Sequence, residues 1–358
     1  MQLAMLGWDE TFSAAFAPYS CAGLSAGRVL LQYNHIYTVG TGSGEVRAQV
    51  SGRLRHETSP EELPAAGDWV ALRLPQGDGE ALIQGVLPRR SKFSRQAAGR
   101  ATREQVVAAN IDTVLLLVGM DNDFSPRRVE RYLAAAWDSG AAPVVVLNKM
   151  DLCADAAGRV AAVEEVAVGV PVHAISALRG DGLEDIAAYC RPRRTVALLG
   201  SSGVGKSTLI NALLGSDRLA TAAVRAGDGR GRHTTTRREL IFLPGGGMVI
   251  DTPGMRELQL WEADEGVHRT FDEIETLAPG CRFRDCRHRD EPGCAVRAAV
   301  EAGELAPDRL ASLHKLQKEL AWFDRQRDQL AAIEEKRRWK AIHKSANRFY
   351  RDSKKRMP

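Results

Sequence analysis

The stretch Gly200-Ser-Ser-Gly-Val-Gly-Lys-Ser-Thr208 decides the fold of this chain. It fits the pattern G-x-x-x-x-G-K-[ST] and lies between two apolar runs, 195–199 and 209–214, which we interpret as a strand and a helix. The glycines let successive backbone N–H groups turn inward onto phosphate oxygens, and the start of the helix adds partial positive charge. A glycine-rich turn that matches by chance is the alternative. The flanking strand and helix favour a phosphate-binding loop in an α/β nucleotide-binding domain.

The residue types in this loop predict its contacts with a nucleotide. Lys206 is expected to reach the β- and γ-phosphates, and the Ser207 hydroxyl is expected to ligate Mg²⁺. The other expected nucleotide-binding residues of the loop are Gly200, Ser201, Ser202, Gly203, Val204, Gly205 and Thr208.

A second motif, Asn148-Lys-Met-Asp151, predicts that the base is guanine. It follows the apolar run 143–147. The Asp151 carboxylate can accept both N1–H and the 2-amino hydrogen of guanine, whereas adenine would leave that carboxylate unpaired. Asn148 is expected to hold the loop and the other edge of the base, the Lys149 stem to cover the base plane, and Met150 to complete the motif. In isolation the motif could be a surface turn.

A later pair of residues supports the assignment of guanine. Ser176 and Ala177 come 25 residues after Asp151, at the end of the next expected strand, 170–175. We expect their backbone N–H groups to meet guanine O6. The helix expected between this strand and the strand 195–199 spans 182–190.

Two further segments are expected to sense Mg²⁺ and the γ-phosphate. Asp251-Thr-Pro-Gly254 ends the apolar run 248–250, so Asp251 is placed to hold Mg²⁺ through water and the Gly254 N–H to contact the γ-phosphate. In Gly231-Arg-His-Thr-Thr-Thr236 a threonine hydroxyl should complete the Mg²⁺ shell, and three consecutive threonines leave Thr235 and Thr236 as alternatives.

The residue that orients the attacking water is not obvious. Many GTPases have Gln after Asp-x-x-Gly, but this chain has Met255, which predicts slow intrinsic hydrolysis. His233 is the nearest candidate for a catalytic role. A surface histidine that contacts RNA or another loop is an equally good interpretation.

The motifs run in the order base, phosphate loop, Mg²⁺ and γ-phosphate, whereas small GTPases begin with the phosphate loop. The order therefore predicts a circularly permuted domain that opens with the strand 112–118, continues through a helix begun by Ser125-Pro126, and ends after Asp251. The runs 239–243 and 248–250, separated by Pro244-Gly-Gly-Gly247, predict a hairpin within it.

The sequence before this domain predicts an all-β unit. Five short alternating runs, broken by turn residues, indicate a small closed barrel between Gly27 and about Arg95, with a long loop at 58–67. A polar, basic linker is expected at 89–104.

The sequence after it predicts a small metal-dependent module. Cys281, Cys286, His288 and Cys294 offer three thiolates and one imidazole, a closed tetrahedral set typical of structural Zn²⁺. Four reduced side chains clustered by chance are the alternative. Helices with an apolar stripe are expected from Asp308 to Arg351.

Together these motifs resemble the bacterial ribosome small subunit-dependent GTPase A family (RsgA/YjeQ). The resemblance covers about Gly27 to Arg356 and implies an OB-fold barrel, a circularly permuted α/β P-loop GTPase domain and an α-helical zinc-binding domain, here 1–98, 99–268 and 269–358. It further implies a GTP hydrolase that assists late maturation of the 30S subunit. The subunit would stimulate hydrolysis, and hydrolysis would release the factor. The implied partners are the 30S subunit, 16S rRNA and GTP or GDP.

Composition and charge fit a monomeric cytoplasmic protein without a membrane span. The chain has 358 residues, with 44% hydrophobic and 26% charged residues, and its start carries Asp9 and Glu10 where a signal peptide would be basic. Ten Lys/Arg against one acid between Lys336 and Met357 indicate a polyanion, with a solvated helix face as the alternative. A nucleotide-switched docking protein with incidental hydrolysis and a membrane-associated GTPase remain competing hypotheses.

Overall fold

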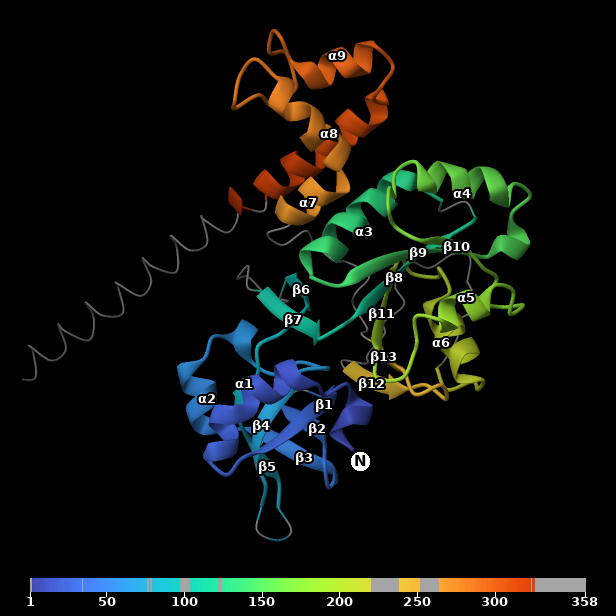
Figure 1. Ribbon diagram of the computed structural model, residues 1–358. Helices are drawn as coiled ribbons and strands as arrows, with labels where there is room; N and C mark the ends of the chain where they lie inside the picture. The colour runs from blue at the N-terminus through green and yellow to red at the C-terminus, as the bar shows by residue number, and fades with distance from the viewer. Residues whose placement is uncertain are drawn as a thin grey trace, which may run out of the picture.

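The structure is a computed structural model of the whole chain. It describes residues 2–33, 35–75, 77, 79–96, 104–121, 124–219, 238–251, 264–322 and 324–325. Figure 1 shows an N-terminal barrel, a central α/β unit and a C-terminal helical module, with the barrel and the module at opposite ends of the central sheet. Within the described residues, no helix combines the length and the apolar character needed to cross a bilayer.

The N-terminal unit is a closed five-stranded barrel, as the sequence predicts. β1 pairs with both β2 and β4, β2 with β3, β3 with β5 in parallel, and β5 with β4, so the sheet returns to its first strand. Alternate side chains point inward and form the barrel core. The strands are β1 (Ser25–Tyr33), β2 (Ile36–Thr41), β3 (Gly44–Val50), β4 (Trp69–Arg73) and β5 (Ala81–Val86).

Aromatic side chains fasten the N-terminal helix onto this barrel. The 3₁₀ turn η1 (Leu3–Leu6) leads into α1 (Glu10–Cys21), whose first turn is capped by the Asp9 carboxylate. The Trp8 and Phe12 rings lie 4.7 and 5.5 Å from the buried Trp69 ring. The long loop after β3 carries α2 (Gly52–Glu57) and η2 (Pro60–Glu62).

The predicted linker is in part a β-ribbon, so that expectation was wrong. β6 (Lys92–Gln96) pairs antiparallel with β7 (Glu104–Ala109). The Phe93 ring is buried, and Arg89 forms a 2.8 Å ion pair with the buried Asp68. The basic residues of this segment indicated a polar linker. Arg89, however, is paired with a buried carboxylate, so this part of the chain packs into the protein.

The central unit is a mostly parallel sheet covered by helices on both faces. The strand order is β10–β9–β8–β11–β13–β12, and only β12 runs antiparallel, in the hairpin predicted with β13. The apolar runs are buried on both faces, as expected for parallel strands. The strands are β8 (Thr113–Gly119), β9 (Ala142–Asn148), β10 (Val172–Ala174), β11 (Thr195–Gly200), β12 (Arg238–Phe242) and β13 (Met248–Asp251). The helices are α3 (Pro126–Asp138), α4 (Ala156–Glu164), α5 (Leu183–Ala187) and α6 (Lys206–Leu214).

The barrel and the central unit share one continuous sheet. β1 pairs antiparallel with β12 at Leu31↔Glu239 and Gln32↔Arg238, which extends the sheet to eleven strands. The Arg238 guanidinium donates to the Gln32 side chain at 3.0 Å and to the Val106 carbonyl of β7 at 3.3 Å. This pairing fixes the barrel against the edge of the sheet, and no feature of the sequence indicated it.

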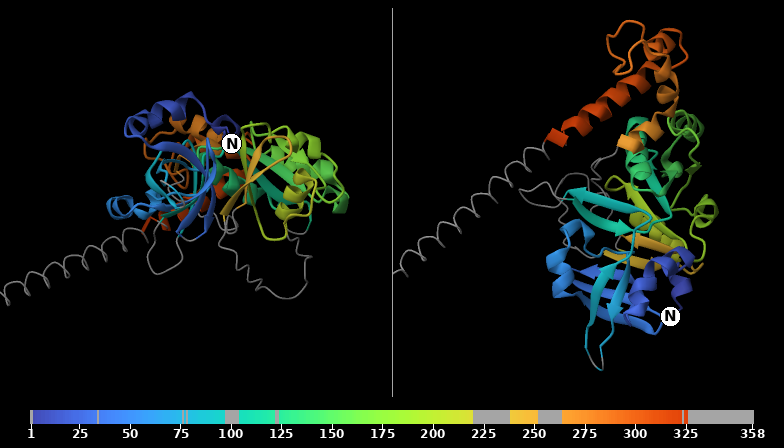
Figure 2. Two further views of the ribbon diagram at one scale, coloured as in Figure 1. Left: turned by 90° about the horizontal axis from the view of Figure 1, so that it is seen from below. Right: turned by 60° about the vertical axis from the view of Figure 1, so that its left-hand side comes forward.

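The C-terminal module packs against α3. It comprises α7 (Asp264–Thr270), α8 (Asp272–Leu277), η5 (Ala278–Gly280), α9 (Ala295–Glu301) and helical residues 307–322. Its core includes Phe271, Val296, Leu313 and Leu316, and Ala134 of α3 joins this cluster. The views in Figures 1 and 2 agree that α7 lies beside α3, at the end of the central unit far from the barrel.

Candidate functional site

The predicted nucleotide-binding segments meet at one edge of the central sheet. In a parallel sheet the carboxyl ends of the strands share an edge, and ligands bind there where the strand order reverses. β11, β9, β10 and β13 lead at this edge into Gly200–Gly205, Asn148–Asp151, Ser176 and Asp251. The chain runs outward from β8 to β10 and then returns to β11 on the other side of β8. The reversal therefore lies between β8 and β11, beside the phosphate loop.

Glycines shape the phosphate loop. Gly203 and Gly205 have φ values of +76° and +102°, a backbone region that favours glycine. A Cβ at Gly200 would come within 2.5 Å of the Leu117 carbonyl oxygen, and a Cβ at Gly205 would overlap the side-chain amide nitrogen of Asn148. The pattern of glycines is therefore required by close approaches to β8 and to the base-reading loop.

Lys206 begins α6 and folds its side chain back over the loop. Its ammonium donates to the carbonyl oxygens of Gly200 and Ser201, each at 2.6 Å. Ser207 and Thr208 follow in the first turn of the helix and are half-buried. The positive charge therefore lies on the loop itself, next to the helix N-terminus, which is the electrostatic arrangement that favours an anion.

Asn148 connects three of the predicted segments. Its side-chain nitrogen donates to the Val204 carbonyl oxygen of the phosphate loop at 2.8 Å, and its side-chain oxygen accepts from the Ala177 N–H at 3.0 Å. The residue is buried, so both bonds lie away from water. One side chain thus holds the base-reading loop, the phosphate loop and the turn after β10 in a fixed relation.

Asp151 lies in the 3₁₀ turn η3 (Met150–Leu152) and faces the turn after β10. The Ser176 hydroxyl donates to its carboxylate at 2.6 Å, which orients the carboxylate. The N–H groups of Ser176 and Ala177, expected to meet guanine O6, already donate to Asp181 and Asn148. Sequence reasoning did not consider the next residue of this turn, the exposed Leu178, whose amide follows that of Ala177.

A second missed residue is Asp121, which follows β8 at the same edge. Its carboxylate accepts from the Lys149 ammonium at 2.6 Å. Lys149 has a left-handed backbone, φ +67°, and both side chains are more than half-buried. The Arg159 guanidinium donates to the Asp121 carbonyl oxygen at 3.1 Å. Asp121 belongs to no motif, and its one signal in the sequence was an acidic residue shortly after an apolar strand.

The remaining predicted nucleotide contacts are only partly described. Asp251 ends β13 at the ligand-binding edge and lies opposite Glu239 in the hairpin. His233, Thr235, Thr236 and Gly254 lie outside the described residues.

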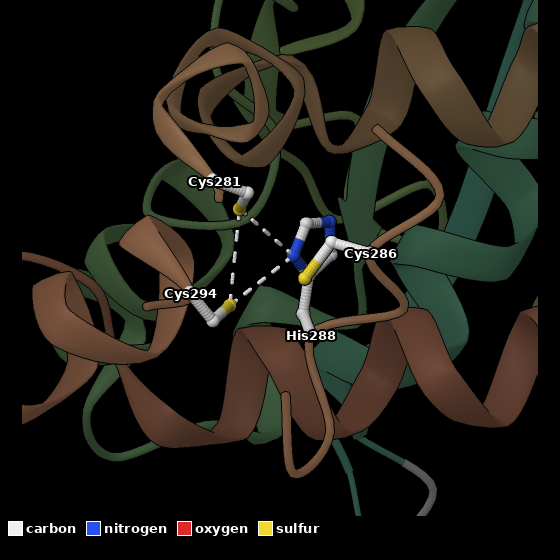
Figure 3. A group of neighbouring side chains, drawn as sticks. All are labelled: Cys281, Cys286, His288 and Cys294. Carbon is white, nitrogen blue, oxygen red and sulfur yellow. Dashed lines mark hydrogen bonds between the residues drawn. The ribbon is translucent and has the colours of Figure 1, made fainter. Parts of the chain in front are cut away.

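The four residues of the Cys/His motif come together in the C-terminal module. Their candidate ligand atoms all lie within 4.8 Å of one another. His288 Nδ1 lies 3.6 Å from Cys281 Sγ and 3.4 Å from Cys294 Sγ, and these two sulfurs are 3.9 Å apart (Figure 3). Tetrahedral Zn²⁺ with bonds of about 2.3 Å to sulfur and 2.0 Å to nitrogen gives S–S and S–N separations of about 3.8 and 3.5 Å. The donor set and its spacing therefore fit a four-coordinate metal ion.

The surroundings of this cluster hold its ligands in place. The Cys294 sulfur caps α9 by accepting from the Arg297 N–H at 3.4 Å. His288 has a left-handed backbone, φ +58°. The loop that carries the ligands has four exposed arginines, Arg282, Arg284, Arg287 and Arg289, and also the acidic residues Asp285, Asp290 and Glu291. The cluster can hold a metal ion.

Known proteins resemble the chain over nearly its whole length. The family model described as RsgA GTPase matches residues 86–261. A small ribosomal subunit biogenesis GTPase RsgA from Opitutus terrae is 52% identical, and the match covers 96% of each chain. The protein of that name from Streptomyces avermitilis is 46% identical over 94% of this chain and 91% of its own length.

Solved structures resemble the chain in the arrangement of its units. YjeQ from Thermotoga maritima has a TM-score of 0.64 at 30% identity, with 83% of this chain and 99% of that chain covered. YloQ, described as a circularly permuted GTPase, has a TM-score of 0.61 at 25% identity, with 83% and 95% covered. With the permuted motifs assembled at one sheet edge, these matches show that the chain is a circularly permuted GTPase and belongs to the RsgA GTPase family.

Proposed function

We propose that this GTPase acts in the late maturation of the 30S ribosomal subunit. The subunit stimulates GTP hydrolysis, and hydrolysis releases the protein from the subunit. The supporting observation is that the predicted guanine-nucleotide-binding residues assemble at one sheet edge, in a chain whose relatives are named small ribosomal subunit biogenesis GTPases. The partners are the 30S subunit and its 16S rRNA, and the protein binds them as a monomer.

The guanine base is bound between three elements. Asp151 accepts from N1–H and the 2-amino group of guanine, with its carboxylate oriented by the Ser176 hydroxyl. The Lys149 stem covers one face of the base, and Asn148 keeps the loop in position. The carbonyl oxygen O6 is met by the Leu178 amide, shared with that of Ala177.

This base assignment has a direct test with a matched control. Asp151→Asn converts an acceptor into a group that also donates, so it should reduce GTP affinity and raise XTP affinity. Asp155→Asn, four residues later, alters a carboxylate that caps α4 by accepting from the Gly158 N–H, so it should leave base preference unchanged. Binding of GTP and XTP is measured by competition against a fluorescent GDP analogue. Unchanged GTP affinity in Asp151→Asn would reject the assignment.

The phosphates and Mg²⁺ are bound by the loop, by α6 and by residues that follow. Lys206 exchanges its carbonyl partners for β- and γ-phosphate oxygens, and Ser207 ligates Mg²⁺. Asp251 holds the ion through water, Thr235 completes its shell and the Gly254 N–H contacts the γ-phosphate. His233 takes part in the catalytic step, which His233→Ala tests through the loss of subunit-stimulated turnover.

The metal of the C-terminal module is one structural Zn²⁺, held by Cys281, Cys286, His288 and Cys294. The four-ligand set leaves no open position, so the ion stabilises the fold and does not activate water. The exposed arginines around it, together with the basic residues near the C-terminus, contact rRNA phosphates. The barrel supplies a further RNA contact, as barrels of this type commonly do.

The chain is organised in three units: 1–98, 99–268 and 269–358. The β6–β7 ribbon crosses the first boundary and serves as the connection between the barrel and the GTPase domain. The proposed function is tested by co-sedimentation with purified 30S subunits. Binding should be tight with a non-hydrolysable GTP analogue and weaker with GDP. Equal binding in both nucleotide states would reject release by hydrolysis.

A further inference from the structure

A cavity of about 610 Å³ opens at the edge of the central sheet opposite the nucleotide site. Six segments meet there: the N-terminal segment at Gly7 and Asp9, the barrel at Arg28 and Trp69, Arg90 before β6, residues 110–112 before β8, Gly140 before β9, and residues 192–195 at the start of β11. Cavities of this size hold small molecules in other proteins. None of the nucleotide-binding residues proposed above lines it.

The cavity carries an excess of positive charge. Its ionisable lining consists of four guanidinium groups and two carboxylates: Arg28, Arg90, Arg193, Arg194, Asp9 and Asp112. Arg90 pairs with Asp9 at 2.6 Å, and Arg194 pairs with Asp112 at 2.7 Å. With four guanidinium groups against two carboxylates, the formal charge of the cavity wall is positive by two. The field inside the cavity therefore favours an anion.

Arg28 supplies the deepest of these charges. Only 2% of it is exposed, and its guanidinium donates to the main-chain oxygens of Leu6, Gly67 and Asn110. Burial lowers the pKa of Arg28 to about 10, so the group stays protonated at neutral pH. Its hydrogen-bond acceptors are neutral, and the nearby Asp112 and Asp68 carboxylates favour its charged form.

Buried polar side chains line the cavity beside Arg28. Asn110 is 7% exposed, and Thr195 is fully buried with no hydrogen-bond partner for its hydroxyl among the described residues. The Asn110 side chain accepts from the Arg90 N–H and donates to the Gly67 carbonyl oxygen, and the Thr195 hydroxyl is inaccessible, so these side chains shape the wall without offering a free contact.

Two residues that line the cavity have a strained backbone conformation. Asn110 and Arg193 have φ values of +55° and +69°. Within the described chain two other non-glycine residues adopt this conformation: Lys149 in the base-reading loop and His288 in the metal cluster. Residues with such a strained backbone cluster at functional sites, where the surrounding structure offsets the free-energy cost of the strain.

We propose that this cavity is a second anion-binding site, which takes a small phosphate-bearing molecule. Arg90 and Arg194, whose side chains are 42% and 63% exposed, receive the ligand, and their planar guanidinium groups suit bidentate contact with phosphate oxygens. The charge balance and the size of the cavity match a pyrophosphate or a phosphate monoester better than a neutral metabolite.

The two sites lie at opposite ends of one strand. β11 begins at Thr195 in the cavity and ends at Gly200 in the phosphate loop, a separation of about 17 Å along an extended strand. Both sites can therefore be filled at once. The second site is measured on protein whose nucleotide site is saturated with GDP and Mg²⁺.

Calorimetric titration of this GDP-saturated protein with inorganic pyrophosphate, in excess Mg²⁺, tests the proposal. We expect one further binding event, weakened at least ten-fold by Arg90→Ala combined with Arg194→Ala. Arg191→Ala is the matched control, since this neighbouring exposed arginine does not line the cavity. Thermal unfolding of each variant shows whether it is folded.

Three outcomes would overturn the proposal. One is the absence of binding heat in the GDP-saturated wild-type protein. Another is an equal loss of pyrophosphate affinity in Arg191→Ala, which would indicate non-specific electrostatic attraction by the surface and not a defined binding site. The third is binding of a single-stranded RNA oligonucleotide, but not of pyrophosphate, that is lost in the double variant. That result would assign the cavity to an RNA phosphate.

Discussion

Asn148 donates from its side-chain amide to the carbonyl oxygen of Val204, at 2.8 Å and across 56 positions of sequence. The circular permutation places these residues in reverse of the order found in small GTPases, yet the sheet brings them together. The bond joins the loop predicted to read the base to the phosphate loop. Because Asn148 also accepts from the Ala177 N–H, its side chain connects both loops to the turn after β10.

Asn148→Ala should weaken GTP and GDP binding together. Two buried hydrogen bonds are lost, each with a net contribution of about 1 kcal/mol, so the expected loss of affinity is about thirty-fold. Equilibrium binding of a fluorescent GDP analogue measures it. Asn211→Ala is the control, because it removes two comparable bonds to Leu219 at a distance from the base. If both variants lose affinity equally, the effect is loss of general stability and not of loop alignment.

Asp121 is expected to act as a positioning residue for Lys149. Asp121→Asn removes the charge that holds the ammonium, so the lysine stem should cover the base less often. Since both side chains are partly exposed, we expect KM for GTP to rise about three- to ten-fold with kcat unchanged. Asp121→Glu should restore part of the effect. A fall in kcat at constant KM would contradict this role.

Arg309 fastens the C-terminal module to α3. Its guanidinium donates to Glu130 of α3 at 2.7 Å, to Glu273 and to the Thr270 carbonyl oxygen. Arg309 and Glu130 are buried, and breaking one partner of such a pair costs about 3–5 kcal/mol. Arg309→Met should therefore lower the thermal midpoint and release the module for proteolysis, whereas guanine-nucleotide binding persists.

The control for that variant is Arg297→Met, which removes an exposed arginine of α9. Equal stability of the two variants would show that the Arg309 cluster does not hold the module. The position of α3 relates the docking of the C-terminal module to the predicted nucleotide site. The helix follows β8 and Asp121, so the module is connected through α3 to the loop that contacts Lys149.

Metal removal should unfold the C-terminal module selectively. The helices α8 and α9 are short, and the Cys/His loop between them has little apolar core of its own, so its fold depends on the ion. Cys294→Ser, or chelation, should reduce helicity and 30S binding, with one equivalent of metal lost by elemental analysis. Cys190→Ser, at a buried cysteine in the GTPase core, should retain the metal. Intact helicity after chelation would contradict the prediction.

The parts of the fold that depend on a local sequence pattern could be predicted from the sequence. The phosphate loop follows β11 because its glycines and apolar flanks are contiguous, and the five barrel strands alternate clearly enough to be recognised. The Cys/His spacing likewise indicated the cluster that the structure brings together.

Features that depend on contacts between distant segments could not be predicted from the sequence. The pairing of Leu31 with Glu239 joins two units through strands that each look complete alone. Arg89 was read as part of a solvated linker because its partner, Asp68, is buried 21 positions earlier. Asp121 and Leu178 belong to no motif, and only the sheet edge shows their relation to Lys149 and Ala177.

The measurement that tests the account most directly is multiple-turnover GTP hydrolysis with and without purified 30S subunits. Met255 follows the Asp251 motif in place of a glutamine, so the chain alone should be slow. We predict that kcat rises by at least ten-fold on addition of 30S subunits, and that 50S subunits have no such effect. An unchanged rate with 30S subunits would contradict the account and favour a docking protein whose hydrolysis is incidental.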